Sequence, residues 1–186
     1  MSASKLIYIT TTSLDGYIED EAGAIDWANP EQVFGFITEL MRPIGTHLLG
    51  RRLYETMTFW DKPVDSYALE QQNFARVWQG AEKVIFSKLE RAFDADVIRE
   101  MKRESEHDIF IGGAEIAGLA IEAGLVDECH LFINPVILGG GKPAFPALRR
   151  KLELLETRDF TTGVIYVHYR ILPMIKSSAP MEGGHF

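Results

Sequence analysis

The sequence contains little cysteine, because Cys129 is the only one among 186 residues, and this excludes an internal disulfide. A chain without disulfides fits a reducing, cytoplasmic setting. No run of apolar residues approaches the ~18 uncharged residues that a membrane span needs. The N-terminus also lacks the charged, apolar and small-residue pattern of a secretory leader. We therefore expect a cytoplasmic protein with no membrane partner.

Basic residues are also scarce: 19 lysines and arginines stand against 27 aspartates and glutamates, giving a net charge of −8. Nucleic-acid binders depend on basic faces that displace counterions from phosphates. The charge balance therefore argues against DNA or RNA partners. A small anionic ligand stays possible, since a few local arginines can oppose the overall field.

The remaining composition, 46% apolar and 25% charged, is that of one ordinary globular domain. No stretch is long enough or polar enough to act as a linker between two domains. We expect one domain over residues 1–175 and a poorly ordered tail over residues 176–186, where glycine and proline gather.

Apolar runs alternate with amphipathic segments along the chain, which predicts an α/β fold with a mostly parallel sheet. Two late strands joined by a short turn predict a C-terminal antiparallel hairpin. Residues 19–29 and 138–146 have no periodicity and are expected to be loops. Strands are expected at residues 5–12, 47–50, 83–87, 108–111, 128–136, 152–159 and 164–172, and helices at residues 51–57, 69–78 and 95–103, after Asn29-Pro30, and from Gly112-Gly113 to Gly124.

Three junctions where a strand ends and another segment begins carry groups suited to a ligand. Ligands of open α/β sheets bind at the carboxyl ends of the strands. Glycine lets backbone approach a phosphate, and guanidinium groups match its oxygens. The junctions comprise Gly50, Arg51 and Arg52; Ser87 and Lys88; and Gly112, Gly113, Ala114, Glu115 and Ile116.

Together the three junctions predict an extended, phosphate-rich ligand that lies across these strand ends. Each junction also has a purely structural interpretation. The glycines can serve tight turns alone, Lys88 can be a solvated turn residue, and Glu115 can simply interact with a helix dipole.

Two nucleotide-binding motifs fail on inspection. The run Gly139-Gly140-Gly141-Lys142 resembles a P-loop, but Pro143 stands where that motif requires serine or threonine. It is interpreted as a structural loop. The spacing G-x-G-x-x-G does not follow from Gly112, so the standard dinucleotide fingerprint is absent as well.

No metal site is expected from the sequence. The five histidines show no i, i+4 pairing and there is no second cysteine. Cys129 and His130 are neighbours on a predicted strand, so their side chains point to opposite faces and Cys129 is expected in the core. The acidic residues from Asp15 to Asp26 are interpreted as a solvated surface, although Asp15 and Asp26 stand apart because Gly16 and Trp27 flank them.

The junctions and the first loop together resemble the dihydrofolate-reductase-like group, which includes the reductase domain of the bifunctional riboflavin-biosynthesis deaminase-reductase. The resemblance covers residues 5–172, and the order and spacing of its segments make it specific. The segments are SLDG at 13–16, AIDW at 24–27, GRRLYE at 50–55, IGGA at 111–114, AGLVDE at 123–128 and PVILGGG at 135–141.

This resemblance implies a three-layer α/β sandwich that uses NADPH as its hydride donor. It implies that residues 50–52 meet the phosphates, and that Ser87 and Lys88 lie near the 2′-phosphate. Residues 112–117 would pass under the pyrophosphate and towards the nicotinamide. Thr11, Asp15, Gly16 and Ile18 would border the nicotinamide. Trp27 and the helix from Pro30, which includes Gln32, would form the wall of the substrate pocket. The resemblance also implies a homodimer formed through the sheet and its late strands.

Two departures concern the substrate. Gln32, with Glu31 beside it, stands where dihydrofolate reductases carry the acid that binds the pteridine. Ile111 stands where the riboflavin-pathway reductase binds its pyrimidine through a glutamate. The resemblance therefore leaves the substrate open.

We expect an NADPH-dependent reductase that delivers hydride to a C=N or C=O group. Its substrate would be a small heterocycle or ribosylaminopyrimidine, as in a 5-amino-6-(5-phosphoribosylamino)uracil reductase. Asp15, Asp26 and Glu31 are the candidate proton donors. The alternatives are a dihydrofolate or pterin reductase, a non-catalytic NADP-binding dimeric protein, or a structural domain whose glycines serve only turns.

Overall fold

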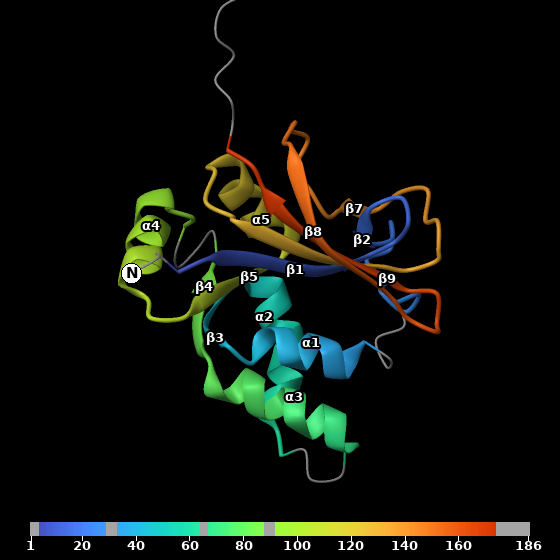
Figure 1. The fold of residues 1–186 in the computed structure, drawn as a ribbon. Helices are drawn as coiled ribbons and strands as arrows, with labels where there is room; N and C mark the ends of the chain where they lie inside the picture. The colour runs from blue at the N-terminus through green and yellow to red at the C-terminus, as the bar shows by residue number, and fades with distance from the viewer. Residues whose placement is uncertain (1–3, 29–32, 64–66, 88–91, 174–186) are drawn as a thin grey trace, which may run out of the picture.

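A seven-stranded mixed sheet forms the centre of the molecule (Figure 1). The computed structural model describes residues 4–28, 33–63, 67–87 and 92–173. The predicted tail at residues 176–186 lies outside these ranges. Within the described residues, no helix is both long enough and apolar enough to cross a membrane.

The strand order is β4-β3-β5-β1-β6-β9-β8. The first five strands are parallel to one another, and β9 pairs antiparallel with both β6 and β8. The sheet is therefore mostly parallel with a C-terminal antiparallel hairpin, as predicted. The strands are β1 Leu6–Thr12, β3 Ile44–Gly50, β4 Glu82–Phe86, β5 Asp108–Gly112, β6 Glu128–Ile133, β8 Leu152–Asp159 and β9 Ile165–Ile171.

Helices cover both faces of this sheet, which gives three layers (Figure 1). Helices α4 and α5 pack on one face, and α1, α2 and α3 pack on the other. The three-layer prediction is thus confirmed. The helices are α1 Phe34–Met41, α2 Arg51–Met57, α3 Leu69–Gly80, α4 Ala95–Glu104 and α5 Ala114–Glu122, with a 3-10 turn at Thr58–Asp61 after α2.

Local chemistry explains where these helices begin and end. The side chain of Asp94 caps α4 by accepting hydrogen bonds from the backbone N–H groups of Asp96 and Val97. Lys102 and Arg103 occupy the last turn, where cations favour the helix dipole. Gly124, with a φ of 69°, follows α5 and lets the chain turn into β6.

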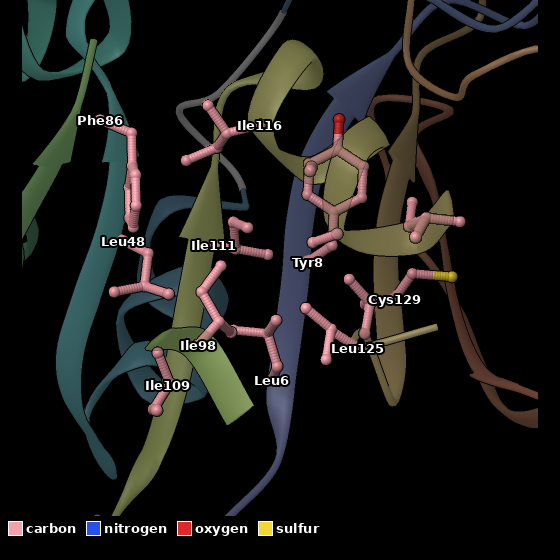
Figure 2. Packing of buried hydrophobic residues seen from close by; sticks show 14 of the residues in the cluster. Leu6, Tyr8, Leu48, Phe86, Ile98, Ile109, Ile111, Ile116, Leu125 and Cys129 are labelled. Carbon is pink, nitrogen blue, oxygen red and sulfur yellow. The ribbon is translucent and has the colours of Figure 1, made fainter. Parts of the chain in front are cut away.

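The face under α4 and α5 is largely aliphatic. Alternate residues of the strands point into it, including Leu6, Leu48 and Ile111, and they meet Ile98 of α4 and Ile116 of α5 (Figure 2). Cys129 also lies in this cluster and is fully buried, as predicted. Burial raises the pKa of its thiol to about 12, so Cys129 is an unreactive core residue.

The opposite face is rich in aromatic rings. Phe34 of α1 contacts Phe74 of α3 edge-on, with ring centroids 4.9 Å apart. Trp78 and Phe110 flank His47, which is fully buried in the middle of this layer. Aromatic contacts of this kind join α1 to α3 and α3 to the sheet.

The structure corrects several predicted boundaries. Helix α1 begins at Phe34 with Val33 as its N-cap residue, later than Asn29-Pro30 suggested. Strand β6 ends at Ile133, and not at Val136. The short strand β2 Tyr17–Glu19 ends where the first predicted loop begins, and β7 Lys142–Pro143 lies inside the second. The two strands pair as a second, two-stranded sheet.

Candidate active site

A cleft of about 610 Å³ opens where β3, β4 and β5 end and α2 and α5 begin. This is the edge of an α/β sheet where ligands bind. The three predicted junctions come together here. The cleft is lined by Gly50, Arg51, Arg52, Leu53, Phe86, Ser87, Ala92, Phe93, Gly113, Ala114, Glu115, Ile116, Leu119 and Lys142.

Two glycines form the floor of the cleft between neighbouring strands. Strands β3 and β5 pair in parallel with Leu49 opposite Gly112, so their following residues run side by side. Gly113 has a φ of 99°, which L side chains rarely adopt, and a Cβ built on it would lie 3.6 Å from the Gly50 Cα. The bare backbone at Gly50 and Gly113 leaves room for a ligand to approach closely.

Three cations surround this floor in a chain whose overall charge is negative. Arg51 and Arg52 are exposed, and Arg51 forms a long ion pair of 3.7 Å with Glu55. The Lys142 ammonium group lies 2.9 Å from a Glu115 carboxylate oxygen. With one lining carboxylate against three cations, the cleft is locally positive and suits an anionic ligand.

Apolar side chains form the rest of the wall: Leu53, Phe86, Phe93, Ile116 and Leu119. A pocket with apolar walls and a few convergent polar groups is typical of a cofactor site. Sequence reasoning missed Leu53, Phe93, Leu119 and Lys142. Their contribution depends on tertiary contacts, such as the approach of Lys142 to Glu115, which has no local signal in the sequence.

Gly112 has a different role from the one expected. It is buried and does not line the cleft. A Cβ at this position would lie 2.6 Å from Leu53 Cδ2 and equally close to the Phe110 ring. Gly112 therefore makes space for Leu53 under the cleft, while Gly113 faces the ligand side.

A second groove of about 600 Å³ adjoins the cleft and shares Arg52 and Lys142 with it. The acidic loop residues Glu19, Asp20 and Glu21 line its other side. A Cβ on Gly141 would overlap the Glu19 backbone, and one on Gly140 would lie 2.7 Å from Glu21 Oε1. The glycine run thus allows two loops to pack closely. This packing accounts for the glycines without any role in phosphate binding.

Asp15 does not line the cleft; its side chain holds the loop at residues 138–139 in place. Its two carboxylate oxygens accept hydrogen bonds from the backbone N–H groups of Leu138 (3.1 Å) and Gly139 (2.7 Å). The hydrogen bond with Ser13, helped by these backbone donors, lowers the pKa of Asp15. A proton donor near neutral pH needs a raised pKa, so this geometry favours a loop-holding role.

The other predicted residues are distributed as follows. Thr11 on β1 and Ile18 on β2 are partly buried and do not line the cleft. Asp26 is exposed, and the Trp27 indole N–H donates to the Ala24 carbonyl oxygen at 3.1 Å. Glu31, Gln32 and Lys88 lie outside the described residues. A separate group of two histidines and one carboxylate, His130, His168 and Glu128, lies on β6 and β9, away from the cleft.

Comparison with known proteins identifies the family. The model of the RibD C-terminal domain matches residues 4–166. Two Bacillus subtilis proteins, both named as uncharacterized, are similar over nearly their whole lengths. YwjB is 33% identical, over 91% of this chain and 98% of its own; YyaP is 29% identical, over 89% of this chain and 94% of its own.

Solved structures show the same fold at low identity. A pyrimidine reductase-like protein from Corynebacterium diphtheriae has a TM-score of 0.61 at 17% identity, covering 92% of this chain and 93% of its own. Dihydrofolate reductase from Enterococcus faecalis, complexed with NADP(H), has a TM-score of 0.57 at 18% identity, covering 90% and 96%. The fold is therefore dihydrofolate-reductase-like, and the chain belongs to the RibD C-terminal domain family, a family of riboflavin-pathway reductase-like proteins.

Proposed function

We propose that the protein is an NADPH-dependent reductase that reduces a C=N or C=O group of a small heterocyclic or ribosylaminopyrimidine-like substrate. The observation that carries this proposal is the positive cleft at the ends of β3, β4 and β5, with Arg51 and Arg52 on its rim. Family membership supports the same reaction class, because the structural relatives include a pyrimidine reductase-like protein.

The cleft residues fit a dinucleotide phosphate. Arg51 and Arg52 offer guanidinium groups to the phosphate oxygens. Gly50 and Gly113 permit the backbone to approach, and the first N–H groups of α5 carry no intrahelical partner. Ser87, at the end of β4, offers a hydroxyl on the side where the resemblance implies the 2′-phosphate.

The apolar wall fits the rings of the same ligand. Phe86, Phe93 and Leu119 present apolar surface along a cleft of about 610 Å³, within the size range of cofactor sites. When bound, NADPH supplies the hydride. The chain holds the reacting groups in place and keeps water away from them.

Reduction of a C=N or C=O group also requires one proton at the nitrogen or oxygen. Asp15 is disfavoured as its source, because its carboxylate is occupied by two backbone N–H groups. Asp26 is an exposed alternative on the loop after β2, and Glu31 follows it in the sequence. An exposed carboxyl exchanges protons with water, so the proton can also come from solvent.

A dihydrofolate or pterin reductase and a non-catalytic NADP-binding protein are the alternatives. The fold shared with Enterococcus faecalis dihydrofolate reductase favours the first. The absence of a carboxylate at Ile111 favours the second. We also infer a homodimer, because Leu152, Leu154 and Leu155 leave apolar surface exposed on the edge strand β8.

The test is NADPH consumption by the purified chain with a panel of pyrimidine and pteridine substrates that carry C=N or C=O groups. The proposal expects turnover with the pyrimidines. Turnover with dihydrofolate alone would favour the first alternative, and NADPH binding without turnover on any compound would favour the second.

A further inference from the structure

Three side chains capable of binding a metal come together on the antiparallel half of the sheet. Glu128 and His130 are two residues apart on β6 and so share a face of the sheet. His168 on β9 pairs directly with His130 across the strands. One ligand atom from each of these residues lies within 4.8 Å of the others. We refer to Glu128, His130 and His168 as the histidine–glutamate cluster.

The separation of one pair of ligand atoms in the cluster is close to that around a tetrahedral ion. His168 Nε2 lies 3.1 Å from Glu128 Oε2, and the two imidazole rings stack with centroids 3.9 Å apart. Two ligand atoms at ~2.0–2.1 Å from a tetrahedral zinc ion are about 3.3 Å apart. These two atoms form a hydrogen bond with each other, and a shared ion would replace that bond at nearly the same separation.

The two ring nitrogens of His130 provide a second observation in favour of a metal site. Its side chain is buried, with only 6% of the residue exposed, and Nε2 has no hydrogen-bond partner among the described residues. Its other nitrogen, Nδ1, lies 2.7 Å from the Tyr166 hydroxyl oxygen. With the proton on Nδ1 and donated to Tyr166, the lone pair is on Nε2. A buried nitrogen without a partner is rare, and metal-binding histidines show this division of roles.

Glu128 is held in a complementary way. Lys5 Nζ lies 2.9 Å from Glu128 Oε1, which leaves Oε2 as the oxygen nearest His168. Carboxylates that bind metals are normally hydrogen-bonded through their other oxygen. Glu156 on β8 lies directly opposite His168 on β9 in the strand register and adds negative charge beside the cluster. His168 keeps 16% of its side chain exposed, so an ion can enter from solvent.

We propose that Glu128, His130 and His168 bind one divalent transition-metal ion of the zinc class, with a fourth position for water. Two imidazole nitrogens and one carboxylate oxygen form a set that zinc accepts. The ion would tie β6, the last strand of the parallel half, to the C-terminal hairpin. None of the three residues lines the cleft, so the proposal is independent of the reductase activity.

The test is calorimetric titration of the untagged, chelator-treated full chain with Zn²⁺, together with visible absorption after addition of Co²⁺. We expect one Zn²⁺ per chain and Co²⁺ bands typical of a four-coordinate site. His130→Gln and His168→Gln should each weaken Zn²⁺ binding at least tenfold. The matched control is His107→Gln, which changes an exposed histidine and should bind as the wild type does.

Tyr166→Phe provides a second variant, because it keeps the ring and removes only the hydroxyl that orients His130. Loss of an outer-shell partner typically weakens metal binding by ~10–100-fold. We expect about a tenfold loss and a shifted Co²⁺ spectrum. The proposal is overturned if the wild type binds no stoichiometric Zn²⁺, if His107→Gln weakens binding as much as the cluster variants, or if Tyr166→Phe leaves both affinity and spectrum unchanged.

Discussion

The cleft and the interior of the sheet place their ionisable groups in opposite environments. Arg51 and Arg52 are exposed at the rim, whereas His47 and His130 are buried between the sheet and its coverings. Burial lowers the pKa of both histidines to about 4. The arginines are therefore charged and accessible to a ligand at the carboxyl ends of the strands, whereas the two buried histidines are neutral near pH 7. From this difference we expect anions to bind at the edge formed by the carboxyl ends of the strands.

The largest expected effect is the loss of NADPH binding in the double variant Arg51→Gln/Arg52→Gln. Each charge-assisted hydrogen bond contributes ~1.5–3 kcal/mol, so removing two should weaken binding by at least about 100-fold. Calorimetric titration with NADPH measures this. The control is Arg99→Gln/Arg103→Gln, which removes the same charge from α4 away from the cleft. Equal affinity in the two double variants would contradict the role of the cleft arginines.

The next largest effect expected is a loss of folding stability at acid pH that depends on His47. The pKa of His47 falls from its ordinary value of 6.5 to about 4 on folding, so the unfolded chain binds more protons between these values. The contribution of neutral His47 to the free energy of unfolding is fully present above pH 6.5. Below that pH it falls by up to ~1.4 kcal/mol per pH unit towards pH 4.

Urea unfolding from pH 7 to pH 4 should show this loss in the wild type and a shallower slope in His47→Leu. His107→Leu, at an exposed site, should keep the wild-type slope. Parallel slopes for wild type and His47→Leu would mean that His47 is not the buried neutral group described here.

A smaller effect is expected at Gly113, whose φ of 99° is nearly restricted to glycine. Gly113→Ala should lower the free energy of unfolding by ~1–3 kcal/mol and reduce NADPH affinity, since the floor of the cleft must shift. Chemical denaturation and titration measure the two effects. Gly80→Ala, at a site with open space around the glycine, should be neutral or stabilising. A neutral Gly113→Ala would show that the floor tolerates a side chain.

The smallest effect is predicted for Asp15→Asn. Asparagine retains one acceptor for the Leu138 and Gly139 N–H groups, so the loop should loosen only slightly. The pH profile of hydride transfer should be unchanged, because Asp15 does not donate the proton in this account. Loss of one limb of that profile in Asp15→Asn, but not in Asp26→Asn, would identify Asp15 as the donor.

Local patterns were sufficient to predict most of the fold. The boundaries of α2 at Arg51–Met57 and β8 at Leu152–Asp159 agree with the periodicity of the sequence. The short strands β2 and β7 were missed, because two or three residues carry no period. At the cleft, the glycine junctions were visible in the sequence, but Lys142 reaches it only through a tertiary contact with Glu115.

The histidine–glutamate cluster was missed for a related reason. Helical i, i+4 spacing was the pattern considered, whereas Glu128 and His130 follow the two-residue period of a strand. His168 joins them through pairing with β6 from 38 positions further along the chain. Register between distant strands is set by the whole sheet, and no single window of sequence contains it.

Binding of a nicotinamide cofactor in the cleft is tested most directly by titrating the wild-type chain with NADPH and with NADH, followed by tryptophan fluorescence and calorimetry. We expect micromolar binding of NADPH, one per chain, with a clear preference over NADH. Failure of either nucleotide to bind would contradict the assignment of the cleft at Gly50, Arg51, Arg52 and Gly113.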